Sequence, residues 1–290
     1  MPLEHAPAKI NLGLHVLRKR ADGYHDVETI LHKIDWFDTV TAEPTEDLSM
    51  TCSDPSLPTD ESNLCMQAAR RLAEACGVTS GAALHLEKRI PYGAGLGGGS
   101  SDAAATLRLC SRLWNVDPSP TQLQEIARSI GADVPFFLTD EPAAYATGRG
   151  DELTPVYDGD APYRLSFPLL VFVPPVTIST PVAYDAVTPN DSDRPSLPAL
   201  LRANDLAQWK TALENDFESP VTDRYEPVAE TRAWLERQGA AYVSLSGSGS
   251  AVYGLFHTME GADQARAEGR SRDGRVHVMD PSDPVPAPAL

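Results

Sequence analysis

Cysteine is scarce in this chain, with four residues among 290. No two of them form a C-x-x-C pair, and none has a histidine neighbour at the spacing of a metal site. Three of them lie among apolar residues in segments with helical spacing, where a free cysteine behaves as a small hydrophobic side chain. This pattern argues against a disulfide framework and against structural zinc. The residues are Cys52, Cys65, Cys76 and Cys110.

Long apolar runs are absent as well. No stretch approaches the roughly 20 residues that a membrane-spanning helix requires. The N-terminal segment, MPLEHAPAKINLGLHV, lacks the basic, then apolar, then small-residue order of a secretory signal. We therefore expect a cytoplasmic protein with no membrane partner.

Basic residues are few relative to acidic residues. Lys and Arg total 24 against 41 Asp and Glu, which gives a formal net charge of -17 at pH 7. A field of that sign repels nucleic-acid phosphates and anionic lipids. We therefore expect no nucleic acid as a partner, and the composition leaves monomer and homodimer open. The few lysines are Lys9, Lys19, Lys33, Lys88 and Lys210.

The composition is otherwise that of a globular protein. Hydrophobic residues make up 42% and charged residues 22% of the chain, which is long enough for one large domain or two modest ones. Strand-like and helix-like segments alternate without a fixed-period repeat, which predicts mixed α and β structure in two lobes. The stretch 189–198 is expected to be a surface loop and the tail 281–290 to be loose. We expect strands at 9–16, 27–34, 39–42, 83–90, 169–173, 241–245 and 251–256, and helices at 62–76, 103–114, 120–131, 199–212, 228–238 and 261–269.

The first expected strand has a distinctive polar face. Apolar residues at 10, 12, 14 and 16 alternate with more polar ones, which is the pattern of a half-buried strand. Because side chains two residues apart in a strand point to the same side, Lys9 and Asn11 should share the polar face.

A glycine-rich segment, PYGAGLGGGSSDAA at residues 91–104, indicates a specific chemistry. Glycines let the backbone turn tightly and bring its N–H groups against a ligand. Ser100, Ser101 and Asp102 then open an expected helix whose positive N-terminal end faces the same space. Amide donors beside a helix N-terminus make an anion site, most naturally for phosphates. A flexible linker is the plainer interpretation, but an expected strand and an amphipathic helix flank the segment directly.

Several phosphate-binding architectures do not fit this segment. Gly93-x-Gly95-x-x-Gly98 formally matches the dinucleotide fingerprint, but it lies far into the chain, and a turn follows where a strand ending in an acidic residue should be. No Lys-Ser or Lys-Thr pair closes it as in a Walker loop. The chain also lacks the His-Arg-Asp and Asp-Phe-Gly triplets of protein kinases. A phosphate loop of another architecture remains.

The segment 91–104 resembles the second motif of the GHMP kinase superfamily, which includes galactokinase, homoserine kinase and mevalonate kinase. PAKINL at 7–12 resembles the first motif of that superfamily, and SLSGSGSAVYG at 244–254 resembles the third. RADGYHDVET at 20–29 and GADVPFF at 131–137 are similar to the 4-diphosphocytidyl-2-C-methyl-D-erythritol kinase family within it. The five motifs occur in the order and spacing of that family over nearly the whole chain.

The resemblance implies an α+β fold, the two-domain GHMP kinase fold. The N-terminal domain, expected at residues 1–157, is a ribosomal-protein-S5-like β/α domain that carries the ATP phosphate loop. The C-terminal α+β domain, expected at residues 158–290, completes a cleft between the two, which is where small ligands usually bind.

The resemblance further implies an ATP-dependent kinase, with Mg²⁺ as a cofactor, that phosphorylates the 2-hydroxyl of 4-diphosphocytidyl-2-C-methyl-D-erythritol in the non-mevalonate isoprenoid pathway. The catalytic pair carries over to Lys9 and Asp133. A carboxylate can take the proton of a hydroxyl during phosphoryl transfer, and an ammonium can hold the developing charge. The ATP-binding positions carry over to Pro91, Tyr92, Gly93, Ala94, Gly95, Leu96, Gly97, Gly98, Gly99, Ser100 and Ser101. The substrate-binding positions carry over to Asn11, Tyr24, His25 and Tyr184, the last a tyrosine where some members have phenylalanine.

Each candidate residue also has a plainer interpretation. Lys9 alone would be a solvent-facing strand lysine, Asp133 a turn or cap residue, and the segment 246–250 a tight turn. Tyr24 and His25 would be an ordinary loop pair. Taken together with the glycine-rich segment, these residues favour catalysis.

Three other functions stay open on the sequence. The chain could be another GHMP kinase that acts on homoserine, mevalonate or a sugar. It could be a GHMP-fold nucleotide sensor without catalysis, which the presence of both Lys9 and Asp133 disfavours. A dinucleotide-dependent oxidoreductase is the weakest alternative.

Overall fold

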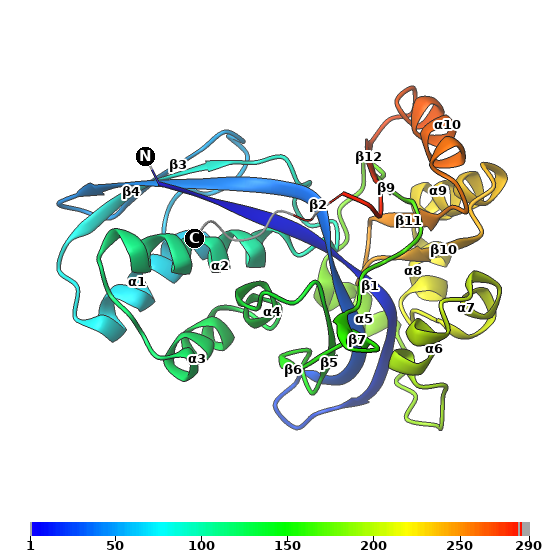
Figure 1. Cartoon of the computed structure of the whole chain (residues 1–290), viewed down its shortest axis with the longest axis horizontal. Coiled ribbons are helices and arrows are strands. Elements are labelled where there is room, and N and C mark those ends of the chain that lie inside the picture. Colours follow the sequence, from blue (N-terminus) through cyan, green and yellow to red (C-terminus); the bar gives the residue numbers. More distant parts are fainter. Residues whose placement is uncertain (1, 284, 286–290) are drawn as a thin grey trace.

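Two β-sheets organise the chain into an N-terminal and a C-terminal half, which lie side by side in the computed structural model (Figure 1). The structure describes residues 2–283 and 285. The first sheet has the strand order β3-β4-β2-β5-β6, with β1 paired to β2, and the second has the order β10-β11-β9-β12. A short separate sheet pairs β7 with β8. The strands are β1 (Leu3–Lys19), β2 (His25–Thr45), β3 (Ser49–Cys52), β4 (Gly81–Glu87), β5 (Ala143–Thr147), β6 (Glu152–Pro155), β7 (Tyr157–Asp158), β8 (Ala161–Pro162), β9 (Leu169–Val173), β10 (Tyr242–Leu245), β11 (Val252–Leu255) and β12 (Arg275–Met279).

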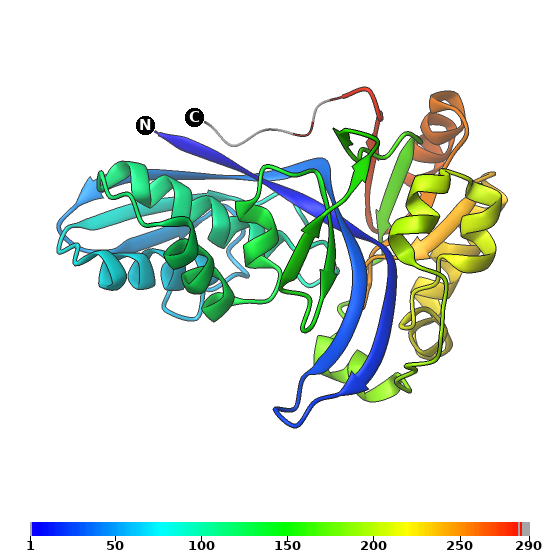
Figure 2. The same cartoon turned by 60° about the horizontal axis from the view of Figure 1, so that its bottom comes forward.

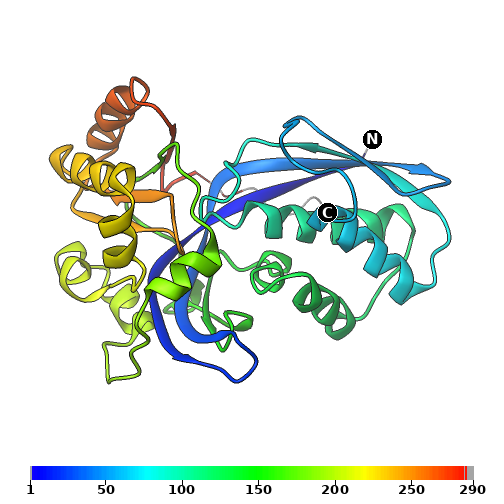
Figure 3. The same ribbon diagram turned by 180° about the vertical axis from the view of Figure 1, so that it is seen from behind.

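The helices fall into two groups. Helices α1 to α4 cover one face of the first sheet, and α5 to α10 belong to the C-terminal half (Figure 1, Figure 3). Leu72, Leu107 and Phe136 are buried in the core between the first sheet and its helices. The helices are α1 (Leu64–Cys76), α2 (Gly98–Leu113), α3 (Pro120–Ile130), α4 (Val134–Leu138), α5 (Thr180–Ala186), α6 (Leu197–Ala203), α7 (Leu206–Ala212), α8 (Glu218–Arg224), α9 (Glu226–Arg237) and α10 (Met259–Gly269).

The long antiparallel hairpin of β1 and β2 joins the two halves (Figure 2). The separate strands expected at 27–34 and 39–42 are parts of the single strand β2, which is 21 residues long. One edge of β2 pairs with β1 along its length, while the other edge takes β5 at residues 29–32 and β4 at residues 39–45. The hairpin therefore extends from the first sheet to the C-terminal half.

Strand β1 is buried on both faces. Every residue from Ala6 to Val16 is buried, so the expectation of a half-buried strand is wrong. The reason is that residues 95–97 and the turn at Gly247 cover the side that carries Lys9 and Asn11, while the apolar side packs in a buried cluster with residues of the C-terminal half. The Tyr253 hydroxyl of β11 donates to the Asn11 carbonyl oxygen at 2.9 Å, and Leu14 forms a bridge with Asn215. The polar side chains of β1 are therefore enclosed in the protein.

Several helix ends depart from the sequence-based expectation. The helix expected from residue 62 begins at Leu64, and Asn63 caps it, because its Oδ1 accepts from the Cys65 N–H at 2.9 Å. Helix α2 begins already at Gly98, despite the poor helix propensity of glycine. The single helix expected at 199–212 is divided into α6 and α7, because Asn204 adopts a left-handed conformation with φ of 49°. The start of α3 after Ser119 and the hairpin of β10 and β11 are confirmed.

The four cysteines are free thiols. Within residues 2–283 and 285, no helix is both long and apolar enough to span a membrane. In the tail expected to be loose, residues 284 and 286–290 lie outside the described residues. The domain boundary between residues 157 and 158 stays a prediction.

Candidate active site

A cleft of about 500 Å³ is lined by residues of both halves and by the β1–β2 hairpin. Most of the predicted site residues line it. They are Lys9, Asn11, Tyr24, Asp133, Tyr184 and residues 91–100. Two predicted residues do not line it: Ser101, which is buried in the first turn of α2, and His25, which lies against Tyr184.

The glycine loop, residues 91–99, approaches the backbone of the C-terminal half too closely for larger side chains. Gly95 has φ of +77°, and a Cβ on it would lie 2.1 Å from the Ser246 carbonyl oxygen. Gly97, at φ of 68°, is the N-cap residue of α2. The first residues of α2 line the cleft, so N–H groups of its first turn are available there. The loop therefore has the geometry of an anion-binding site.

The Gly/Ser turn between β10 and β11 supports this loop. Ser246 Oγ donates to the Gly95 carbonyl oxygen at 2.8 Å, and the Ala251 N–H donates to the Ala94 carbonyl oxygen at 3.0 Å. Gly247 and Ser248 of the same turn line the cleft. The turn is therefore part of the site, and the plainer interpretation of it as an isolated tight turn is wrong.

Lys9 lies in a buried hydrogen-bond network behind the loop. Its Nζ donates to Asn11 Oδ1 at 2.5 Å and to the Gly95 carbonyl oxygen at 2.8 Å. Asn11 Nδ2 donates to Thr29 Oγ1 at 2.9 Å, which turns the amide oxygen toward Lys9. Burial lowers the pKa of Lys9, and the Asp133 carboxylate opposes that shift. Asn11 thus orients the ammonium, and the interpretation of Lys9 as a solvent-facing lysine is wrong.

Asp133 faces Lys9 from the N-terminal end of α4. Its Oδ2 lies 3.9 Å from Lys9 Nζ, and its side chain is 34% exposed. Asp133 occupies the N-cap position of α4 without a side-chain capping bond, so it does not act as a helix cap. The carboxylate therefore faces the cleft beside a buried ammonium, where it can accept a proton from a bound hydroxyl.

Aromatic side chains form another part of the cleft wall, which Tyr184 and Phe217 line, while His25 lies against Tyr184. The rings of His25 and Tyr184 stack with centroids 4.8 Å apart and an interplanar angle of 16°. Tyr184 also packs edge-on against Phe217, with centroids 4.8 Å apart. Burial and then Lys19 lower the pKa of His25, while Asp185 opposes the shift, so the imidazole is neutral at pH 7. A neutral imidazole offers one hydrogen-bond donor and one acceptor to a flat polar ring.

A buried charge cluster lies next to the glycine loop. It consists of Lys88, Asp38 and Asp102, and a Cβ on Gly98 would lie 3.0 Å from Lys88 Nζ. Lys88 Nζ lies 2.5 Å from Asp38 Oδ2 and 2.7 Å from Asp102 Oδ2. Burial raises the pKa of Asp102 to about 8, an effect that Lys88 opposes and Asp38 reinforces. Burial lowers the pKa of Lys88, but the two carboxylates outweigh it and the net shift is upward. The cluster joins β2, the end of β4 and the first turns of α2.

Some cleft residues were not predicted from the sequence. Thr29 of β2 orients Asn11, and Thr180 lies 3.4 Å from Ser248 through their hydroxyl oxygens. Arg149, in the loop between β5 and β6, lines the cleft beneath Tyr24. Thr29 ends the motif at 20–29 and Ser248 lies in the motif at 244–254, whereas Arg149 belongs to no motif, although the two glycines that flank it could have indicated a functional turn.

Both halves of the chain match models of known protein families. The model of the GHMP kinases N terminal domain matches residues 63–141, and that of the GHMP kinases C terminal matches residues 196–273. A 4-diphosphocytidyl-2-C-methyl-D-erythritol kinase of Salinibacter ruber is 63% identical over 280 residues, which are 96% of this chain and 99% of that relative. A crystal structure of 4-(cytidine 5'-diphospho)-2C-methyl-D-erythritol kinase is 36% identical, with a TM-score of 0.79 over 96% of this chain and 98% of the other. A homoserine kinase from Cytophaga hutchinsonii, with a TM-score of 0.72 over 96% of this chain and 93% of the other, is only 20% identical and shares the fold alone.

Proposed function

Because the chain belongs to the 4-diphosphocytidyl-2-C-methyl-D-erythritol kinase family of GHMP kinases, it is a small-molecule kinase with ATP as its phosphoryl donor, and we propose that Lys9 and Asp133 carry out the transfer. The acceptor is the 2-hydroxyl of the cytidine diphosphate ester that gives the family its name. This assignment leaves no place for the dinucleotide-dependent oxidoreductase considered on the sequence.

One observation carries the residue assignments. The glycine loop, the Lys9–Asp133 pair and Tyr184, which stacks on His25, all meet the same cleft. The loop supplies N–H donors for the phosphates of ATP, and the neutral imidazole and the tyrosine ring suit a cytosine. The γ-phosphate of ATP and the acceptor hydroxyl would then meet beside the Lys9 ammonium and the Asp133 carboxylate.

The proposed step follows from these groups. The oxygen of the 2-hydroxyl attacks the γ-phosphorus of ATP while its proton passes to the Asp133 carboxylate. The bond from the γ-phosphorus to the bridging oxygen breaks, and ADP leaves with the electron pair of that bond. Lys9, fixed by Asn11 and by the Gly95 carbonyl oxygen, stabilises the charge that develops on the transferred group.

We also propose Mg²⁺ as the cation that accompanies ATP. The residues at the loop suit it, because Ser100 lines the cleft and Ser101 Oγ, in the next position, is buried without a hydrogen-bond partner in the described part of the chain. Hydroxyl and phosphate oxygens are ligands of the kind that Mg²⁺ prefers. The ion would neutralise part of the phosphate charge. We further propose that the reaction takes place in the cytoplasm and that the enzyme is a monomer or a homodimer.

A substrate panel tests the proposed function. ADP release is measured with ATP, Mg²⁺ and one acceptor at a time: 4-diphosphocytidyl-2-C-methyl-D-erythritol, homoserine, mevalonate or galactose. We expect kcat/KM for the cytidine substrate to exceed that for each other acceptor by at least about 100-fold, since those acceptors leave the polar groups of the base site unpaired.

Two results would contradict the proposal. Faster turnover of homoserine, mevalonate or galactose would assign the cleft to another GHMP reaction. ATP binding without turnover of any acceptor would favour the nucleotide sensor over the enzyme.

A further inference from the structure

The cleft of this strongly acidic protein contains two basic side chains among its described lining residues, Lys9 and Arg149. Lys9 is held by Asn11, the Gly95 carbonyl oxygen and Asp133 at the place proposed for catalysis. Arg149 has no part in that step. Since the net charge is -17 and the proposed substrate carries a diphosphate, a second cation in the cleft requires an explanation.

Arg149 is held in place by part of its guanidinium, and other N–H donors of that group remain available to a ligand. Its Nη2 donates to Asp151 Oδ2 at 2.8 Å, and its guanidinium carbon lies 5.2 Å from the centre of the Tyr24 ring. The hydrogen bond to Asp151 raises the pKa of Arg149, so the group stays charged. Within the described residues, no further hydrogen bond is made by its guanidinium, and its side chain is 32% exposed. One N–H donor of the planar Arg149 guanidinium is hydrogen-bonded to Asp151, and its other N–H donors can bind an anion.

Arg149 lines the same cleft as the carboxylate of Asp133 and two of the aromatic residues proposed to bind the base. The preceding residue, Gly148, accepts from the Val27 N–H at 2.8 Å, which fixes the loop beside the start of β2. Arg149, Tyr24 and Ala132, the residue next to Asp133, line both the cleft and a neighbouring hollow. In the substrate, the diphosphate joins the cytidine to the methylerythritol unit. A cation that lines the cleft together with Tyr24 and Asp133 is therefore in a position to bind that diphosphate.

We propose that Arg149 binds the diphosphate of the substrate and makes the cleft selective for a nucleoside diphosphate ester over an uncharged polyol. The inference rests on the proposed function. The plainer alternative is that Arg149 has a structural role alone. It would then fix its loop through the hydrogen bond to Asp151 and cover the ring of Tyr24. That role would support every ligand of the cleft alike, whereas a phosphate contact acts only on ligands that carry the diphosphate.

Ligand binding to Arg149→Gln separates these roles. The dissociation constants of CDP and of cytidine are measured by titration calorimetry for wild type, Arg149→Gln and Arg128→Gln. Arg128 is the matched control, because it is an exposed arginine that borders the neighbouring hollow but not the cleft. We expect Arg149→Gln to weaken CDP binding about 10- to 100-fold, the effect of losing a hydrogen bond between charged groups, and to leave cytidine binding within about threefold. Arg128→Gln should change neither.

Steady-state kinetics supply the second readout. In Arg149→Gln, the KM for the cytidine substrate should rise by a similar factor, while the KM for ATP stays within about threefold. Equal losses for CDP and cytidine, an equal loss in Arg128→Gln, or a rise confined to the KM for ATP would each overturn the assignment. If CDP binds the wild type but is unaffected by Arg149→Gln, this inference alone fails. Failure of the wild type to bind CDP at all would overturn the proposed function and this inference with it.

Discussion

Asp133→Asn is expected to lower kcat about 10²- to 10⁴-fold, which is the usual contribution of a general base. Asparagine keeps the shape of the side chain but cannot accept the hydroxyl proton. The partly exposed Asp133 makes no capping bond to α4, so its replacement should leave the fold intact. Single-turnover measurement of ADP formation checks the result, because it reports the chemical step rather than product release.

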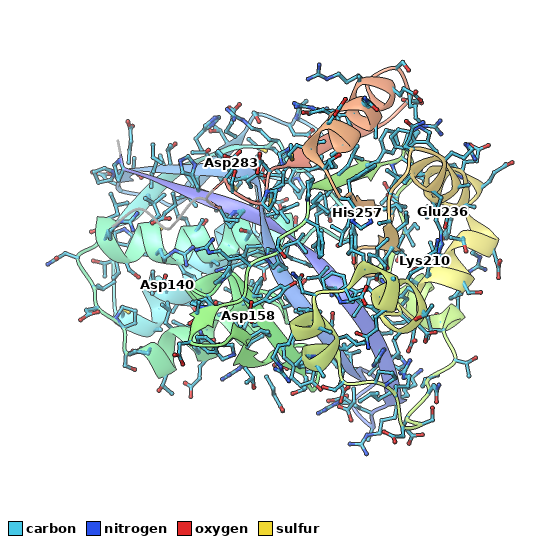
Figure 4. The ribbon with its side chains drawn as sticks, turned by 45° about the vertical axis from the view of Figure 1, so that its right-hand side comes forward. Asp140, Asp158, Lys210, Glu236, His257 and Asp283 are labelled. Carbon is cyan, nitrogen blue, oxygen red and sulfur yellow. The ribbon has the colours of Figure 1, made fainter. Side chains whose placement is uncertain are left out.

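The control is Asp140→Asn, the loss of an exposed carboxylate just beyond the other end of α4 and outside the cleft lining (Figure 4). It should leave kcat within about twofold, as surface substitutions away from a site usually do. Lys9→Met should lower kcat to a similar degree as Asp133→Asn. Because residues that act as a unit are not additive, the double variant should be little slower than the slower single variant. Turnover that survives in Asp133→Asn would exclude this carboxylate as the base.

Lys88→Met is expected to reduce the free energy of unfolding by about 3–5 kcal/mol, the effect of breaking a buried ion pair by removing one partner. Lys88 is the ammonium between two carboxylates that are themselves almost fully enclosed, Asp38 and Asp102. Chemical denaturation checks the value. Lys210→Met, at an exposed position of α7 in the C-terminal half, is the matched control and should stay within about 0.5 kcal/mol of wild type (Figure 4).

The pH dependence of the same cluster gives an independent check. The pKa of Asp102 in the folded protein, about 8, lies above its ordinary value of 3.8, so folding binds a proton between these values. This group therefore contributes stability at low pH that is lost as the pH rises through that window. An asparagine side chain does not titrate, so the stability of Asp102→Asn relative to wild type should increase from pH 5 to pH 8. An unchanged difference would show that the cluster does not bind this proton, and a neutral effect of Lys88→Met would show that the cluster is not buried as an ion pair.

The glycine loop and the proposed catalytic pair could be predicted from the sequence because their residues lie in contiguous motifs. Gly95 and Gly97 are required by local backbone conformation and close contacts, which a run of glycines indicates directly. The pairing of Lys9 with Asp133 came from the resemblance, since the two are far apart in the chain. The structure places their charged groups 3.9 Å apart.

Other features depend on contacts that no local pattern records. The alternation in β1 predicts one polar face toward solvent, but the glycine loop and the turn at Gly247 cover that face and enclose Lys9 and Asn11. Helix α2 begins in glycines because tertiary contacts override their propensity. The proposed role of Arg149 was not predicted from the sequence. It depends on the position of this residue beside Tyr24 and in the cleft lining, and not on its neighbours in the chain.

The position of the new phosphate on the product tests the central claim most directly. Carbon 2 of the methylerythritol unit bears the methyl group and no hydrogen, so a phosphate on its oxygen has no proton three bonds away. We expect the proton-coupled ³¹P spectrum of the wild-type product to contain one new phosphomonoester resonance without three-bond proton splitting. A doublet or triplet would place the phosphate on a secondary or primary hydroxyl, and it would contradict the account of how the cleft presents its substrate to Asp133.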